Sequence, residues 1–442
     1  MNAKILRVMK TCNVFLVNMQ GRLIVLLKPV MILFIALSLS LSITEGKTLQ
    51  TEKEGLTTNA TPEVRWTAGY DMDFRLRYPD NIEVTQLYEA TPETGTFSLH
   101  AYITCFKGVL FASWDVHARD ENSSGQHGVM RRSSDYGKTW SQLEVLFPPL
   151  SSNVPAADPY PYTRFHTNNG FAVIDDALYA ISDVAEWTTP GASKGRPRVV
   201  VGRMARSVNP DGGLGELFWL LPTAPEPIKG FPSIPAGDPV IVDKINYYLS
   251  QPGNEPQLNF GREAHPISDD NRGLGEPVPA WQLEDGTWVK LYRAGSIRGY
   301  RSAQEREDTR PRRKYASFSF DDGKTWTVPT RTNFTDAGAR TNSGRLPDGQ
   351  IYVINNLLPM NPQKGGRVLL AISLSRDGLT FDRATMIRFV PPPPRYQGRS
   401  KRHGYQYPES VVVGEYLWVI YSVNKEDVEV ARIPVDELYK LK

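Results

Sequence analysis

Two histidines stand at opposite ends of one stretch of alternating hydrophobic residues, and both could transfer protons. His100 comes just before residues 101–114, and His117 follows them closely. The Lys107-Gly108 pair in the middle predicts a turn, so the stretch is typical of two paired strands. Both imidazoles could then face one pocket, although a single histidine is more often an ordinary core or surface residue. Histidine titrates near neutral pH and suits a general base, a role that we assign first to His117.

Three further segments combine polar, charged and aromatic residues next to predicted strands. Arginine and asparagine side chains there could bind a carboxylate group, because both donate hydrogen bonds in fixed geometry. The alternative for each segment is hydrogen bonding within its own loop. The candidate catalytic residues are His100, His117, His265 and Tyr407, and the candidate substrate-binding residues are Gln126, Arg293, Arg340, Asn342, His403 and Tyr405.

A repeated octapeptide indicates which elements position these side chains. Residues 133–140 and 319–326 both fit the pattern Ser-x-Asp-x-Gly-x-Thr-Trp, and residues 374–381 keep the Gly-x-Thr-aromatic half without the first Asp. Ser and Asp side chains can bond backbone groups across a tight turn, and Gly can take the positive φ angle there. Repeated units of this kind predict a repeat architecture.

The spacing of the octapeptides predicts an all-β propeller. Residues 319 and 374 are 55 positions apart, which divides a mature chain of roughly 390 residues into about seven blades. Six blades with long insertions are the alternative. No long amphipathic helix is expected. Five stretches have the alternation and central turn of an inner hairpin, namely residues 101–114, 171–181, 280–291, 343–354 and 410–421.

The N-terminal residues resemble an export signal rather than part of the fold. Basic residues precede an apolar run at residues 30–41, and small residues follow it. We predict a signal peptide at residues 1–45, a linker at 46–62 and a catalytic propeller domain at 63–442. The protein would then be periplasmic or secreted, and the alternative is an uncleaved anchor.

Charge and cysteine content restrict the function classes. The net charge is only +3, and an exported chain makes nucleic acid an unsuitable partner. Cys105 would be the single thiol of the mature chain, which argues against a cysteine metal site. We expect no required cofactor, with a structural divalent cation left open, no stable membrane insertion, and a monomer that binds an oligosaccharide or polysaccharide.

The octapeptides resemble the Asp box, or BNR repeat, of sialidase-like β-propellers. The box is a folding element, so it says little about the reaction. The chain is also similar to a subgroup of these propellers, the seven-bladed ulvan lyases and rhamnose–glucuronate lyases, although Leu99 stands where a second histidine is expected. The segments that carry this similarity are residues 261–264, 344–349, 404–408 and 421–426.

The resemblance implies β-elimination at a uronic acid. In that reaction Arg or Asn neutralises the carboxylate, His removes the C5 proton, and Tyr or His protonates the group leaving from C4. A sugar leaving group makes the enzyme a lyase, and a free hydroxyl at a chain end makes it a dehydratase. The alternatives are an exo-acting sialidase- or rhamnosidase-like hydrolase and a glycan-binding propeller without catalysis.

Overall fold

The computed structural model describes residues 15–17, 23–25, 61–69, 76–123, 125–149, 163–187, 198–220, 234–256, 266–297, 312–359 and 365–441. Residues Thr61–Lys442 form one compact unit and Met1–Ala60 another. In the N-terminal unit, β1 (Phe15–Val17) pairs with β2 (Leu23–Val25). Within the described ranges, no helix is long and apolar enough to cross a membrane.

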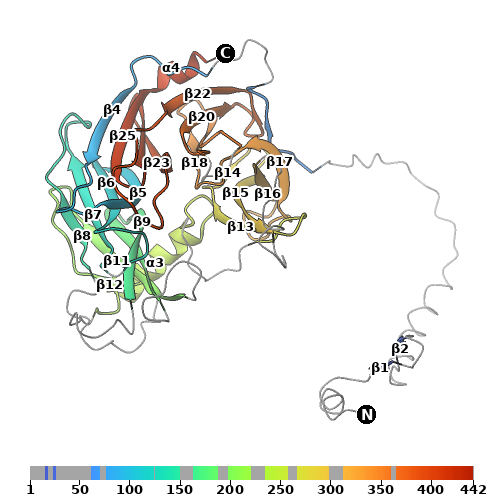
Figure 1. The fold of residues 1–442 in the computed structure, drawn as a ribbon, viewed down its shortest axis with the longest axis horizontal. Coiled ribbons are helices and arrows are strands. Elements are labelled where there is room, and N and C mark those ends of the chain that lie inside the picture. Colours follow the sequence, from blue (N-terminus) through green and yellow to red (C-terminus); the bar gives the residue numbers. More distant parts are fainter. Residues whose placement is uncertain are drawn as a thin grey trace. The chain divides into compact units, whose positions relative to one another are not determined.

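The larger unit consists of antiparallel sheets arranged around a common centre, as in a β-propeller (Figure 1). We number these sheets blades 1 to 5. Blade 1 contains β5 (Phe97–Phe106), β6 (Val109–His117), β7 (His127–Ser133) and β8 (Glu144–Phe147), and blade 2 contains β9 (Thr163–Ile174), β10 (Ala177–Trp187), β11 (Arg198–Val208) and β12 (Phe218–Trp219). Blade 3 contains β13 (Arg272–Pro277), β14 (Trp281–Gln282), β15 (Trp288–Ile297), β16 (Arg313–Ser319) and β17 (Thr330–Thr335). Blade 4 contains β18 (Asn342–Arg345), β19 (Ile351–Asn355), β20 (Leu369–Ser375) and β22 (Arg383–Phe389).

Blade 5 joins the two ends of the propeller. Its strands are β23 (Tyr405–Val413), β24 (Tyr416–Val423), β25 (Asp427–Pro434) and β4 (Glu83–Tyr88), and β4 pairs antiparallel with β25. A second link is the parallel pairing of β3 (Arg65–Trp66) with β21 (Thr380–Phe381). Strands from the start and the end of the unit therefore share hydrogen bonds, which closes the arrangement and covers an edge strand.

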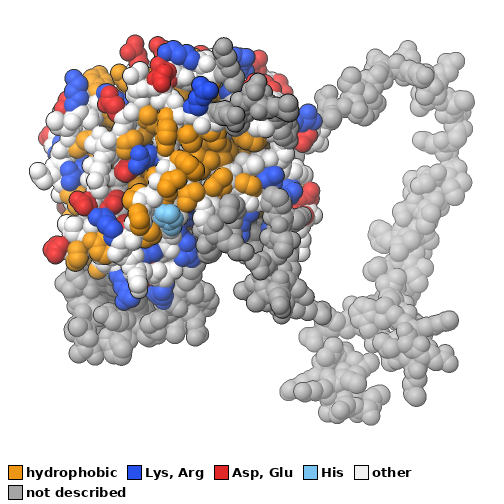
Figure 2. Space-filling view, turned by 45° about the horizontal axis from the view of Figure 1, so that its top comes forward, with side chains coloured by type: hydrophobic (Ala, Val, Ile, Leu, Met, Phe, Trp, Pro, Cys, Tyr) orange, Lys and Arg blue, Asp and Glu red, His pale blue; other side chains and the backbone are white. Residues whose placement is uncertain are grey.

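Apolar side chains fill the space between neighbouring blades. Ile354 and Ile372 of blade 4 pack with Val419 of blade 5 in one buried cluster. Trp114 of blade 1 and Ile420 of blade 5 belong to another. The loss of this apolar surface from water is the main term that stabilises the blades. On the face shown in Figure 2, hydrophobic side chains gather across the middle, and basic and acidic side chains of both signs lie around them.

All five predicted inner hairpins are present, one in each blade. In blade 1 the turn residues Lys107 and Gly108 have φ angles of 50° and 78°. In blade 2 the turn residues Asp175 and Asp176 have φ angles of 47° and 61°. Positive φ at both central residues is typical of the two-residue turn that matches the twist of paired strands.

The described residues form five blades, where the repeat spacing predicts seven or six. The blades begin at unequal intervals, because long segments separate some of them. One such segment contains helix α3 (Pro239–Ser250), which the sequence analysis did not expect. Asp238 caps this helix by accepting hydrogen bonds from the amides of Val240 and Ile241, and Ile245 and Leu249 pack against blade 2.

The Asp boxes lie between the last two strands of blades 1, 3 and 4. In blade 3, Thr325 donates to both carboxylate oxygens of Asp321, through its hydroxyl at 2.6 Å and its amide at 2.8 Å. The Ser319 hydroxyl also donates to Asp321 and accepts from the amide of Gly323, each at 2.8 Å. The bonds from Thr325, with that from Ser319, lower the pKa of Asp321 to about 2.

The third box retains its aspartate, so the prediction that it lacks one is wrong. Ser375 donates to Asp377 at 2.8 Å, and Asp377 accepts from the amide of Thr380 at 2.6 Å. This box is one residue shorter than the others, which displaced Asp377 by one position in the alignment to the octapeptide. Its Phe381 is buried in the core between blades 3 and 4.

We predict that Asp321→Ala lowers the melting temperature by about 2–4 °C, because the loop loses its shared acceptor. Asp80→Ala, at an exposed turn aspartate, is the control and should change it little. Thermal unfolding followed by circular dichroism checks both variants. Equal melting temperatures for the two variants would show that the box does not stabilise the blade.

Candidate active site

Side chains from all five blades meet in one cluster near the inner strands. Its hydrogen bonds and ring contacts connect each member to the next across blade boundaries. The residues from blades 1 to 5 in turn are His100 and Tyr102, Asn169, Arg293, Arg340 and Asn342, and Tyr407 and Glu409. Arg340 and Asn342 come from the start of β18 and the loop before it. The cluster thus contains five of the ten residues predicted from sequence.

Two bulges direct the central aromatic side chains. The pairing of β5 with β6 shifts between Leu99 and Tyr102, and that of β23 with β24 shifts between Gln406 and Glu409. His100 and Tyr407 lie in these bulges with φ angles of 53° and 52°. Positive φ is unfavourable for residues of this size, so the surrounding packing must impose it. The two rings lie beside each other, with centroids 5.7 Å apart.

His100 forms a buried pair with Asp115 of β6. The Nδ1 atom of His100 lies 2.8 Å from Oδ2 of Asp115, and Nε2 lies 3.8 Å from Oε1 of Glu121. The backbone amide of Asn168 donates to both oxygens of Asp115, at 3.1 and 3.0 Å. Burial raises the pKa of Asp115 well above its usual value. A carboxyl group fixed in this way orients the imidazole and sets its tautomer.

Tyr407 is surrounded by cations. The guanidinium of Arg293 donates to its hydroxyl at 3.4 Å. The guanidinium carbon of Arg367 lies 5.4 Å from the centre of its ring, and the ammonium of Lys425 lies 5.8 Å from it. Positive charge on three sides of this ring would attract an anionic ligand.

Arg340 is fully buried, and its partners are fixed. Its guanidinium donates to Oε1 of Glu409 at 2.7 Å and to the hydroxyl of Tyr102. Asn342 donates to the other oxygen of Glu409, also at 2.7 Å. Burial raises the pKa of Glu409 to about 7, although Arg340 opposes the rise. The carboxyl group of Glu409 is therefore poised to change charge close to neutral pH.

A second buried ion pair holds the loop that carries Arg340. The ammonium of Lys314 lies 3.0 Å from Oδ1 of Asp336, and both side chains are fully buried. Asp336 also accepts from the amide of Gly338 at 3.0 Å, and Arg367 donates to the Gly338 carbonyl at 3.3 Å. The loop is therefore held in place before any ligand binds, which lowers the cost of ordering it.

The side chains of the cluster differ in how far they are exposed to solvent. His100 is 2% exposed and Tyr407 7%. Tyr102, Glu121 and Arg293 are half-buried. A ligand would therefore approach over these three side chains, and Tyr407 and His100 would lie beneath it.

The other predicted site residues lie elsewhere or act differently. The Nδ1 atom of His117 accepts from the amides of Arg119 and Asp120, at 3.1 and 3.0 Å, which fixes a turn. The buried Gln126 side chain donates to the carbonyl of His166 and accepts from the amide of Asn122. Both side chains therefore stabilise the backbone next to the cluster by hydrogen bonds to main-chain groups.

Tyr405 and His403 are not members of the cluster. Tyr405 is buried in the core between blades 4 and 5, where its ring contacts that of Tyr421 edge-on at 5.6 Å. His403 is exposed, and its Nε2 lies 3.4 Å from the carbonyl of Pro391. His265 and residues 261–264 lie outside the described residues. We leave these residues out of the proposed site.

Several residues of the cluster or in direct contact with it were not selected from sequence, chiefly Tyr102, Asp115, Asn169, Arg367, Glu409 and Lys425. Tyr102 and Glu409 each stand two positions after a selected aromatic residue, His100 or Tyr407. In a regular strand such positions share one face, but a bulge lies within each pair, so strand periodicity alone does not predict their common orientation. Asp115 could be found only from the register of β5 with β6.

The cluster suits acid–base chemistry on an anionic ligand. Among the residues that the structure describes, no group of three or more His, Cys, Asp or Glu side chains could hold a metal ion. What is present is an imidazole oriented by a carboxyl group, a phenol and several cations. Such groups can move a proton and neutralise a carboxylate.

Residues 287–419 match the family model described as a BNR repeat-like domain. The fold is similar to that of a solved sialidase, with a TM-score of 0.64 and 22% sequence identity over 84% of this chain and 35% of that protein. It is also similar to Trypanosoma rangeli sialidase in complex with the inhibitor DANA, with a TM-score of 0.51 and 12% identity over 82% of this chain and 61% of that one. No curated protein matches the sequence significantly.

These comparisons define the class of fold, a β-propeller of the sialidase type that carries BNR repeats. The chain spans about a third of the length of the first sialidase and about three fifths of the second. At these identities the similarity shows the fold alone.

We predict that Glu409→Gln changes the pH dependence of stability. Glu409 has a folded-state pKa of about 7 and an ordinary value of 4.5, so the folded state binds more protons between these values. Its contribution to stability is therefore full below the ordinary value and falls as pH rises towards 7. The melting temperature of Glu409→Gln relative to wild type should rise from about pH 5 to about pH 7.5.

The control is Glu415→Gln, at an exposed turn of the same blade, whose difference from wild type should not vary with pH. Parallel melting curves for Glu409→Gln and wild type across this range would contradict the raised pKa.

Proposed function

We propose that the protein is a carbohydrate-active enzyme that performs β-elimination at a uronic acid in an ulvan-like oligosaccharide. The observation that carries the proposal is the contact of the His100–Asp115 pair with Tyr407, which is itself surrounded by Arg293, Arg367 and Lys425. A base, an acid and a carboxylate-binding group are the three functions that the reaction needs.

The first step is removal of the C5 proton of the uronate. The Nδ1–H group of His100 donates a hydrogen bond to Asp115, so Nε2 is the nitrogen that takes the proton from carbon. The uronate carboxylate lies near Arg293, where positive charge stabilises the anion that develops on deprotonation. The structure favours His100 over His117 as the base, because His117 uses Nδ1 to fix a turn.

The second step breaks the C4–O bond. The electron pair of the former C5–H bond becomes a C4=C5 double bond, and the departing oxygen takes a proton from the Tyr407 hydroxyl. The centroids of the His100 and Tyr407 rings are 5.7 Å apart, close enough for one sugar ring to contact both groups. A sugar leaving group gives a lyase reaction, and a C4 hydroxyl gives loss of water.

A second candidate function is hydrolysis with Tyr407 as the nucleophile. It is favoured by the hydrogen bond from Arg293 to the Tyr407 hydroxyl and by the raised pKa of Glu409, two positions further on. Hydrolysis creates a new reducing end without a double bond. Ultraviolet absorbance of the unsaturated uronate, measured together with reducing ends on ulvan and rhamnose–glucuronate oligosaccharides, therefore distinguishes the two reactions.

Export and a monomeric state remain part of the proposal. The basic and apolar residues before position 42 support secretion, and a secreted enzyme would meet polysaccharides outside the cell.

A glycan-binding propeller without catalysis is the remaining alternative. It would bind the same oligosaccharides but produce neither the ultraviolet absorbance nor new reducing ends.

We predict that His100→Gln lowers turnover of the uronate substrate by about 10²–10⁴-fold, because glutamine cannot accept the C5 proton. His403→Gln is the matched control at an exposed histidine and should retain wild-type turnover. Initial rates from the absorbance assay check both. If His100→Gln keeps wild-type rates while His403→Gln loses them, the base has been placed on the wrong histidine.

A further inference from the structure

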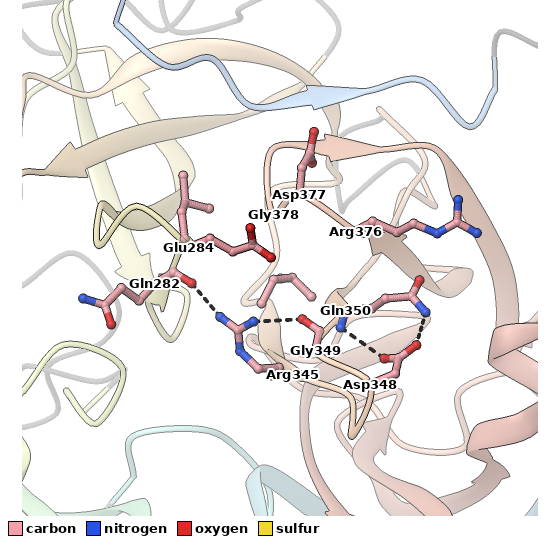
Figure 3. A pocket seen from close by; sticks show the side chains of 11 residues that line it. Gln282, Glu284, Arg345, Asp348, Gly349, Gln350, Arg376, Asp377 and Gly378 are labelled. Carbon is pink, nitrogen blue, oxygen red and sulfur yellow. Dashed lines mark hydrogen bonds between the residues drawn. The ribbon is translucent and has the colours of Figure 1, made fainter.

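A cavity of about 350 Å³ lies where blade 3 meets blade 4. Its walls come from three turns: the one after β14, the one between β18 and β19, and the third Asp box. Figure 3 shows these turns facing one another. Asn342 begins β18 and Arg345 ends it, so the cavity lies at the opposite end of this strand from the candidate active site.

Hydrogen bonds between the turns fix the shape of the cavity. Arg345 bridges two blades, since it donates to the carbonyl of Gly349 at 2.8 Å and to that of Gln282 at 2.5 Å (Figure 3). Asp348 accepts from the amide of Gln350 at 3.1 Å, and Asp377 accepts from the amides of its own box. The walls are thus ordered without a ligand.

The lining combines hydrogen-bonding groups of both kinds with a small apolar surface. Glu284 is an exposed acceptor, and in Figure 3 its carboxylate points into the space between the turns. Arg376 is an exposed donor at the edge of the cavity, and in Figure 3 its guanidinium points away from the space between the turns. Leu283 and Ile351 contribute the apolar part of the wall.

We propose that this cavity binds one sugar residue of a glycan chain, at a site separate from the catalytic cluster. A sugar ring has hydroxyl groups that both donate and accept around its edge, and an apolar C–H face that can lie on Leu283. The cavity volume falls in the lower range of small-molecule sites, which is suitable for a single ring. Acidic groups beside the arginines favour a neutral sugar residue over a polyanionic one.

The site would hold a polysaccharide to the enzyme while another part of the chain reaches the active site. Two linked contacts raise the apparent affinity for a polymer beyond that of either contact alone. A short oligosaccharide that cannot reach both sites gains nothing. This inference rests on the proposed glycan substrate, but not on the elimination step.

The test is affinity electrophoresis of the full chain in gels that contain ulvan. The double variant Glu284→Ala/Arg376→Ala should bind ulvan about 10-fold more weakly than wild type, because a charged acceptor and a charged donor are lost. Both side chains are exposed, so the fold should be unchanged in circular dichroism. Glu415→Ala, at the corresponding turn of blade 5, is the control and should bind as wild type does.

Retardation of the double variant equal to that of wild type, or the absence of retardation of wild type, would overturn the inference. Turnover of a short uronate trisaccharide separates this outcome from failure of the proposed function. The double variant should keep wild-type turnover on the trisaccharide. A loss of turnover there, as large as its loss of ulvan binding, would assign the cavity residues to the active site and overturn a separate binding site.

Discussion

The buried charge of Arg340 is the constraint on which the centre of the propeller depends. A fully buried guanidinium is costly unless it is paired and hydrogen-bonded, and here Glu409 and Tyr102 supply the partners. These residues come from blades 4, 5 and 1, so the pairing requires three blades to meet in one arrangement. Asn342 then binds the second oxygen of Glu409. The fold and the candidate active site are thus linked by the same hydrogen bonds.

The strained backbone of His100 and Tyr407 is the kind of feature found at catalytic sites. His100 and Tyr407 occupy equivalent bulges in blades 1 and 5, and each has a positive φ angle that a residue of its size rarely adopts. Regular strands would alternate their side chains between faces, whereas a bulge re-aims one of them. These bulges bring the imidazole of His100 and the phenol of Tyr407 together, and Asp115 holds the imidazole in place.

Much of the fold follows from local sequence patterns, because alternation and turn residues specify each hairpin without reference to distant residues. All five inner hairpins and two complete Asp boxes could be predicted in this way. Helix α3 could not, since Pro235 and Gly237 before it are typical of a loop. The spacing of the octapeptides does not fix the number of blades, because the described blades begin at unequal intervals. In the site, His100, Arg293, Arg340, Asn342 and Tyr407 were predicted from their places beside strands. Tyr405 was wrongly grouped with Tyr407 because the bulge after Gln406 is invisible in the sequence, and Asp115 was missed because its contact depends on strand register.

The central claim is that this cluster removes a proton from carbon, and isotope labelling at that carbon tests it most directly. A uronate oligosaccharide carrying deuterium at C5 would be turned over by wild-type enzyme, and the product and solvent would be analysed by mass spectrometry and NMR. The account predicts that the label is lost to water in every turnover and that the labelled substrate reacts more slowly. Products that keep the label at C5, with reducing ends formed at the same rate as from unlabelled substrate, would contradict elimination and favour hydrolysis.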